Sequence, residues 1–179
     1  MFFAALCISL LAFANQAYAV SWYFLRYYPA SGQRFTSFSG NLVTPNQPNA
    51  ATIYVWPGLQ PTDNSGVYQN VMDGRSGTCV AFRNELGGST WTSTLTRSST
   101  GETASDNFAL SSKSFNQALF AIELYDVPWN FGQVSFTNVV ITSSGSGDSS
   151  WCNDRPENYN GATVYSIQGN RYHYVALDR

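Results

Sequence analysis

The sequence predicts an all-β domain built as a sandwich or a barrel. After Val20 no segment sustains the apolar period of about 3.6 residues that an amphipathic helix needs. Short runs of β-favourable residues instead alternate with turn residues, about every eight to twelve positions. Aromatic residues make up 16% of the chain, and Ser, Thr, Asn and Gly are abundant. This composition is typical of an extracellular β-protein.

The expected strands follow from those alternating runs. Turn residues predict breaks at Thr44–Asn49, Pro57-Gly58 and Ser98–Gly101, and a two-residue hairpin turn at Gly169-Asn170. The expected strands are Trp22–Tyr28, Phe35–Leu42, Thr52–Trp56, Gly66–Val71, Cys79–Arg83, Thr90–Arg97, Asn107–Leu110, Ala118–Tyr125, Gln133–Ile141, Ala162–Ile167 and Tyr172–Leu177.

The first residues have the pattern of a signal peptide. Phe2 to Ala14 is almost wholly apolar, but it is shorter than the ~20 residues that a membrane span needs. Ala17-Tyr18-Ala19 then supplies a small-x-small cleavage pattern. We therefore expect residues 1–19 to be removed and residues 20–179 to form a single secreted domain, with no membrane-spanning segment. An ordinary buried helix at the start of the chain is the alternative.

Charge and histidine content exclude several classes of function. The net charge is −2, charged residues make up 11% of the chain, and Lys113 is the only lysine. A nucleic-acid-binding protein would carry clustered Lys and Arg, so nucleic acid is not an expected partner. His173 is the only histidine, and no metal-ligand spacing surrounds it. We expect no metal, no cofactor and a monomer.

Two cysteines remain after the expected cleavage, Cys79 and Cys152. In an oxidising compartment they most simply form a disulfide. Such a bridge closes a loop of about seventy residues, for which the chain-entropy model gives roughly 4 kcal/mol of stabilisation. Two free thiols are the alternative.

The expected strand Ala118–Tyr125 has two different faces. Phe120, Ile122 and Leu124 point to one side, which predicts a core face. Glu123 points to the other side, where a carboxylate must be solvated, paired or protonated. This second face is predicted to be a groove or a wet concave surface.

Several segments, in the same order along the chain, resemble the fungal glutamic endopeptidases (eqolisins). Thr52-Ile53-Tyr54-Val55-Trp56-Pro57-Gly58-Leu59 followed by Gly66–Asp73 is similar to the family's Trp-x-Gly strand and glutamine-bearing strand. Trp91–Phe108 resembles its Thr/Ser-rich strand pair. Ala118–Tyr125 and Asn130–Asn138 resemble its Ala-Glu-Trp-Ile-Val-Glu-Asp and Phe-Gly-x-Val-x-Phe-x-Asn segments. The resemblance implies a concanavalin A-like jelly-roll sandwich of two antiparallel sheets.

The resemblance also implies site residues. In the family a glutamine and a glutamate activate water and hold the tetrahedral intermediate at acid pH. Gln69 matches that glutamine, and Trp56 matches a nearby tryptophan. The position of the catalytic glutamate holds Leu119, which can neither take nor donate a proton. Glu123 matches a second, non-catalytic glutamate, about 13 Å further along the strand at ~3.3 Å per residue.

A second departure from the family follows Asp73. The family carries a long stretch with an aromatic Trp-Tyr-Glu-Trp-Tyr-like strand there, whereas Cys79–Gly88 is short. A strand of the sheet that carries the substrate is therefore expected to be lost or shortened. Glu85 and Glu123 are possible proton carriers if the site has been rebuilt, with ordinary surface or wet-face carboxylates as the alternative.

Three functions are compatible with these patterns. The first is a secreted lectin-like protein that binds or acts on a cell-wall or extracellular glycan. The second is an acid glutamic-type endopeptidase that uses Gln69 and a displaced glutamate. The third is a non-enzymatic interaction protein. For the glycan function, Trp129 and Trp151 are expected on exposed loops. The expected catalytic residues are Gln69 and Glu123, and the expected ligand-binding residues are Trp56, Tyr68, Asn70 and Tyr125.

Overall fold

The computed structural model describes residues 20–45, 52–73, 79–110, 112–145, 151, 155–160 and 173–177, with the backbone alone at 73 and 173–176. The expected signal peptide, Cys152, the expected strand Ala162–Ile167 and the Gly169-Asn170 turn lie outside these residues.

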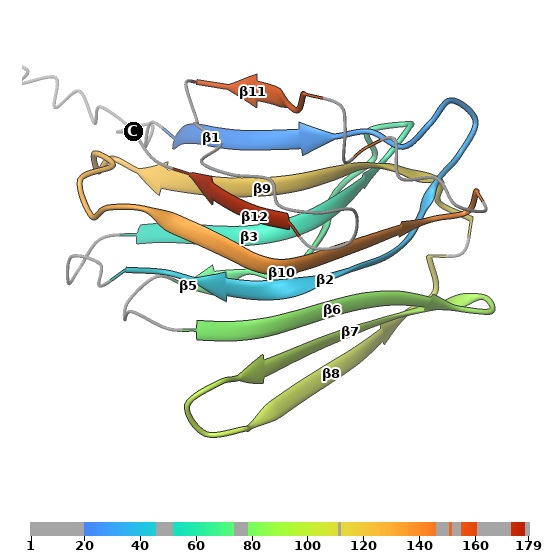
Figure 1. Ribbon diagram of the computed structural model, residues 1–179, viewed down its shortest axis with the longest axis horizontal. Helices are drawn as coiled ribbons and strands as arrows, with labels where there is room; N and C mark the ends of the chain where they lie inside the picture. Colours follow the sequence, from blue (N-terminus) through green and yellow to red (C-terminus); the bar gives the residue numbers. More distant parts are fainter. Residues whose placement is uncertain are drawn as a thin grey trace, which may run out of the picture.

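Two antiparallel sheets are packed face to face (Figure 1). In sheet A the strand order is β11-β1-β9-β3-β4, and β5 also pairs with β3. Its strands are β1 (Val20–Tyr27), β3 (Thr52–Pro61), β4 (Tyr68–Gln69), β5 (Met72–Asp73), β9 (Phe115–Tyr125) and β11 (Glu157–Tyr159). In sheet B the order is β12-β10-β2-β6-β7-β8. Its strands are β2 (Phe35–Val43), β6 (Cys79–Gly87), β7 (Thr90–Arg97), β8 (Thr103–Phe108), β10 (Val134–Ser143) and β12 (His173–Leu177).

The core lies between the two sheets and is centred on aromatic rings. The ring of Phe120 in β9 meets Phe38 of β2 at 5.2 Å, Phe136 of β10 at 4.8 Å and Tyr27 of β1 at 5.8 Å, all in edge-to-face geometry. Ile122 and Leu124 are buried on the same face of β9. The predicted core face of this strand is confirmed, and so is the predicted antiparallel jelly-roll sandwich.

The predicted break at Pro57-Gly58 is wrong, because β3 continues through it to Pro61. Proline is tolerated in a strand where its missing N–H is not needed. The carbonyl of Pro57 accepts a hydrogen bond from the backbone N–H of Asn70, which lies between β4 and β5. Pro57 therefore faces the gap between these two short strands, where the ladder is already interrupted.

Three other strand predictions differ from the structure. The expected strand Gly66–Val71 is reduced to the two residues of β4, with β5 following after a gap. Strand β8 begins at Thr103, earlier than predicted, and pairs its Thr and Ser hydroxyls with those of β7. Strand β11 was not predicted, because Glu157-Asn158-Tyr159 has little β-propensity of its own. It pairs with β1, where the rings of Tyr159 and Phe24 stack at 4.8 Å.

The structure does not show the predicted disulfide. Cys79 is a free thiol at the start of β6, beside Val43 at the end of β2. Trp151, the residue before Cys152, packs against Tyr27 at the end of β1.

Candidate functional site

The site is built on the outer face of sheet A, which points away from the core. Gly58 in β3 pairs with Gln69 of β4 on one side and with Leu119 of β9 on the other. Paired residues of antiparallel strands point to the same face. The two positions that the resemblance assigns to catalysis therefore lie in one cross-strand row. One of them holds a glutamine and the other a leucine.

Gly58 makes this row possible because a larger residue would not fit. A Cβ atom at Gly58 would lie 2.9 Å from the Cγ1 atom of Val67 and 3.1 Å from the ring of Trp56. Real Cβ atoms essentially never approach other atoms at the shorter of these distances. The absent side chain lets the Trp56 ring and the loop before β4 close over β3.

Glu123 is the buried carboxylate of this face. Its side chain is 7% exposed, and it accepts hydrogen bonds from Trp56 Nε1 at 2.7 Å and from the Tyr125 hydroxyl at 3.1 Å. From the sequence this carboxylate is expected to be solvated, paired or protonated, and the structure shows that it is paired through these hydrogen bonds. Partial burial raises the pKa of Tyr125, and the hydrogen bond to the Glu123 carboxylate raises it further. Tyr125 therefore remains a neutral hydrogen-bond donor at acid and neutral pH.

A depression of about 250 Å³ brings Gln69 and Glu123 together, with Tyr54, Val71 and Tyr125 as the other lining residues. Glu123 pairs with Tyr54, four residues along β3 from the Gly58 row. That separation is about 13 Å at ~3.3 Å per residue, so Gln69 and Glu123 reach the depression from opposite ends. Both side chains line the depression that lies between these two rows.

A second depression, of about 350 Å³, continues from the other side of Gln69. Its walls are mainly apolar, and Val67 and Phe108 in them are among the exposed large hydrophobic residues of the chain. Lys113 and Ser65 also line it. The pocket is therefore suited to a large apolar group, with one cation nearby.

The loop between β3 and β4 is fastened by a small polar cluster. Lys113 Nζ donates to Asp63 Oδ2 at 3.0 Å and to Ser65 Oγ at 2.6 Å, and the backbone N–H of Ser65 donates to Asp63 Oδ1 at 3.0 Å. Hydrogen bonding from the Ser65 side chain lowers the pKa of Asp63 most, followed by the hydrogen bonds from Lys113 and from the Ser65 backbone, and together they take it from 3.8 to about 2. The cluster therefore stays formed in solutions acidic enough to protonate most carboxylates.

The low pKa of Asp63 predicts a specific pH dependence of stability. A carboxyl whose pKa is lower in the folded state stabilises the fold above its unfolded pKa, and that contribution is lost as pH falls through the folded pKa. The change Asp63→Asn should therefore flatten the fall of Tm between about pH 4 and pH 2. Thermal unfolding followed by circular dichroism across this range measures it. Asp106→Asn on β8 controls for the loss of one charge, and equal slopes in both variants would contradict the assignment.

Two of the expected ligand-binding residues do not line the depression beside Glu123, although Tyr68 does line the second depression. Tyr68 points into the sandwich, where its ring meets Trp91 at 5.6 Å. Asn70 is buried, with its Nδ2 donating to Ser93 Oγ at 2.5 Å and its Oδ1 accepting from Asn84 Nδ2. This network ties the end of β4 in sheet A to β6 and β7 in sheet B. Trp56 and Tyr125 do lie on the outer face of sheet A, both bonded to Glu123.

Other sequence-based expectations are corrected by the structure. Glu85 lies in β6 of sheet B, in an exposed ion pair with Arg83 at 2.6 Å, so it takes no part in the depression beside Gln69. Trp129 and Trp151 are buried rather than exposed. Trp129 Nε1 donates to the carbonyl of Gly132 at 2.8 Å, which folds the loop back over its own ring.

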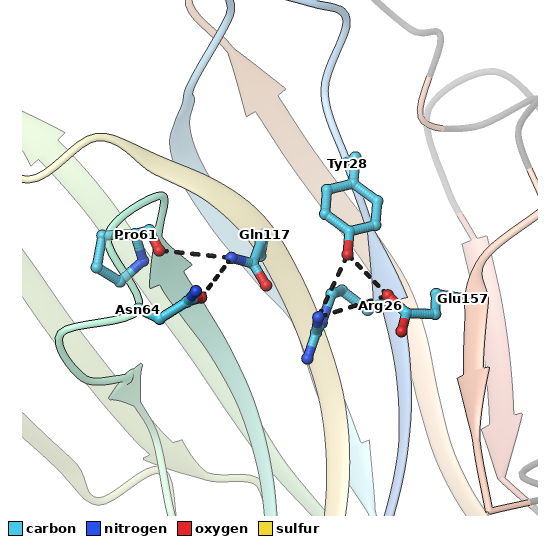
Figure 2. Close-up of polar contacts among 6 residues, drawn as sticks. All are labelled: Arg26, Tyr28, Pro61, Asn64, Gln117 and Glu157. Carbon is cyan, nitrogen blue, oxygen red and sulfur yellow. Dashed lines mark hydrogen bonds and ion pairs between the residues drawn. The ribbon is translucent and has the colours of Figure 1, made fainter.

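Figure 2 shows a polar group at the other end of the same face that sequence reasoning missed. Arg26 Nη1 lies 3.4 Å from Glu157 Oε2 and donates to the Tyr28 hydroxyl at 3.3 Å, and that hydroxyl donates to Glu157 Oε2 at 2.7 Å. On the neighbouring strand Gln117 Nε2 donates to Asn64 Oδ1 at 3.1 Å. The alternating direction of side chains along β1 and β9 could have indicated this group, since it places Arg26 and Gln117 on the same face as Leu119.

Among the described residues, no group of three or more His, Cys, Asp or Glu side chains could hold a metal ion. Within that same part of the chain, no helix has the length and apolarity to cross a membrane.

Comparison with known proteins defines the fold. No protein-family model matches the chain, and no curated protein matches it by sequence. Among solved structures, the chain is similar to SCP-B, a member of the eqolisin family of peptidases in complex with the tripeptide Ala-Ile-His. The TM-score is 0.57 and the identity 16%, over 89% of this chain and 99% of that one.

A second similar structure is scytalido-glutamic peptidase. Its complex with a peptide-based transition-state analogue has a TM-score of 0.58 and 15% identity, over 89% of this chain and 99% of that one. Its complex with a transition-state analogue inhibitor gives 0.56 and 15%, over 88% and 99%. The chain therefore has an eqolisin-like fold.

Proposed function

We propose that this protein is a secreted, acid-acting glutamic-type endopeptidase in which Gln69 and Glu123 carry the chemistry. The observation that supports it most is that both residues line one depression on the outer face of sheet A. The fold of the chain is that of glutamic peptidases, two of which are solved with a tripeptide or a peptide-based analogue bound. An open depression on a sheet face suits an extended polypeptide.

In the proposed reaction Glu123 transfers protons and Gln69 stabilises the negative charge that develops on the substrate. The Glu123 carboxylate takes a proton from the water that attacks the peptide carbonyl, and later gives that same proton to the departing amine. The Gln69 side-chain amide donates a hydrogen bond to the oxygen that becomes negative in the tetrahedral intermediate. Trp56 Nε1 and the Tyr125 hydroxyl hold the Glu123 carboxyl in position. Leu119 replaces the family's proton carrier, so Glu123 is the carboxyl left on this face of β9.

The proposal predicts proteolysis at acid pH that depends on both side chains. Purified protein should cleave denatured casein between about pH 2 and pH 5. Gln69→Ala and Glu123→Gln should each lower the rate by about 10²-fold or more, since each removes one catalytic contribution. Peptide release measured by mass spectrometry gives the rates.

Glu85→Gln on sheet B is the matched control and should leave the rate unchanged. Casein that stays intact across the whole pH range would overturn the proposal.

A second candidate function is favoured by the aromatic surface beside Glu123. Trp22, which pairs with Glu123, is 38% exposed, and Tyr159 at the edge of the same sheet is 50% exposed. Exposed rings next to carboxylate and amide groups suit the stacking and hydrogen bonding by which sugars are held, so an extracellular glycan or polysaccharide is the alternative ligand. Signal on a glycan array that Trp22→Ala and Glu123→Ala remove, together with intact casein, would favour this function.

A further inference from the structure

Two buried polar atoms on the outer face of sheet A have no hydrogen-bond partner: Arg26 Nε, which is a donor, and Gln117 Oε1, which is an acceptor. The Gln117 side chain as a whole is 6% exposed. Leaving such groups unpaired is costly, and in native proteins most of them find a partner. An orphaned donor and an orphaned acceptor near each other therefore call for a ligand that supplies both kinds of group.

The register of β1 and β9 brings these two side chains to one place. Arg26 pairs with Leu119, and Gln117 lies two residues before Leu119 on the same face of β9. Diagonal neighbours of this kind have Cα atoms about 7–8 Å apart, within reach of long side chains. Figure 2 shows Gln117 between Asn64 and the Arg26–Tyr28–Glu157 group.

Existing contacts fix the direction of both groups. Gln117 Nε2 donates to the Pro61 carbonyl at 3.4 Å and to Asn64 Oδ1 at 3.1 Å. A backbone carbonyl only accepts, so the amide nitrogen is on that side and Oε1 faces away from it. Arg26 is held through Nη1 by Tyr28 and Glu157, and its Nε is left for another partner.

We propose that Arg26 and Gln117 bind one peptide group of a polypeptide lying across sheet A. The peptide carbonyl accepts from Arg26 Nε, and the peptide N–H donates to Gln117 Oε1. A carboxylate offers only acceptors and would face the Gln117 oxygen, while an ammonium offers only donors and would face Arg26. This assignment rests on the proposed function, because a sugar hydroxyl also offers one donor and one acceptor.

The position of this subsite sets the length of the substrate. Gln69, Gly58, Leu119 and Arg26 form one row across four neighbouring strands. Three strand spacings of about 4.8 Å place Arg26 about 14 Å from Gln69. An extended chain covers that span in about four residues, so the peptide group at Arg26 lies roughly four residues from the bond beside Gln69.

A backbone ester scan tests the assignment. The probe is an end-blocked octapeptide with Ala-Ile-His at its centre, in which each amide in turn is replaced by an ester that has no N–H donor. Affinity is measured by fluorescence anisotropy at neutral pH, where hydrolysis is slow. The ester that replaces the amide donating to Gln117 should weaken binding to the wild-type protein about tenfold. The Gln117→Leu protein should bind the all-amide parent peptide more weakly, and it should no longer distinguish that peptide from the ester.

The control is Gln60→Leu, at the position of β3 that pairs with Gln117. In this variant the effect of the ester on affinity should persist. If Gln117→Leu does not fold, Arg26→Lys keeps the charge beside Glu157 and removes Nε, and it should weaken the parent peptide by a similar factor. A flat ester scan with a parent peptide that binds would overturn the peptide-group assignment alone. A parent peptide that does not bind at all would overturn the assignment and count against the proposed function as well.

Discussion

Replacing Leu119 by glutamate is expected to raise the rate of acid proteolysis by about 10²- to 10⁴-fold, the usual contribution of a positioned general acid or base. Leu119 and Gln69 flank Gly58 in one row, so the new carboxyl would stand next to the glutamine amide rather than four residues along the sheet. This change restores the pair that the eqolisin resemblance implies.

The environment of Leu119 sets the pH at which this gain should be seen. The leucine is 3% exposed and packs with Trp56 and Ala121. An ionised carboxylate in that position is poorly solvated, whereas the protonated form is tolerated. The increase should therefore be largest on the acid side and accompanied by reduced stability at neutral pH.

Leu119→Gln is the matched control for this experiment. Glutamine has nearly the same size and polarity as protonated glutamic acid but cannot transfer a proton. Casein cleavage by the two variants, compared at equal folded concentration, separates proton transfer from a simple change of groove shape. Equal rates in the two folded variants would show that this row is not where the peptide bond is cleaved.

Strand β9 explains why its part of the site could be predicted from sequence. It is a central strand, long enough for the two-residue alternation to be read without ambiguity. Phe120 and Glu123 therefore pointed in the predicted directions. The alternation could not show that the outer face of β9 is also covered, since that burial comes from Trp56 on a neighbouring strand.

The assignments around β4 failed for a physical reason as well. A strand of two residues gives no periodicity from which a face can be read. Gln69 points outward, whereas Tyr68 enters the core and Asn70 turns inward to reach Ser93 and Asn84. The directions of Tyr68 and Asn70 depend on contacts with the other sheet, which come from distant parts of the sequence.

The residues missed altogether depend on long-range pairing. Arg26 and Gln117 are more than ninety positions apart in sequence and meet only because β1 lies beside β9. Glu157, the partner of Arg26, is held by a strand with little propensity of its own. In the same way β3 overrides the breaking tendency of Pro57-Gly58, because β9 pairs with it along its whole length.

The alanine variant of Phe120 should lower the free energy of unfolding by about 3–5 kcal/mol, the usual range for removing a buried phenylalanine. The ring is fully buried and is enclosed by Tyr27, Phe38 and Phe136, which belong to three different strands. Rings held on separate strands cannot close the resulting cavity without shifting backbone, so the cost should lie toward the upper end. Urea unfolding followed by tryptophan fluorescence measures the change.

Val71→Ala is the control, because that side chain is exposed on the rim of the depression. It should cost well under about 1 kcal/mol. A similar small cost for Phe120→Ala would mean that the two sheets are not packed through this ring. The outward direction of Leu119 and Glu123 would then lose its basis, since alternation along β9 ties the orientation of these side chains to that of Phe120.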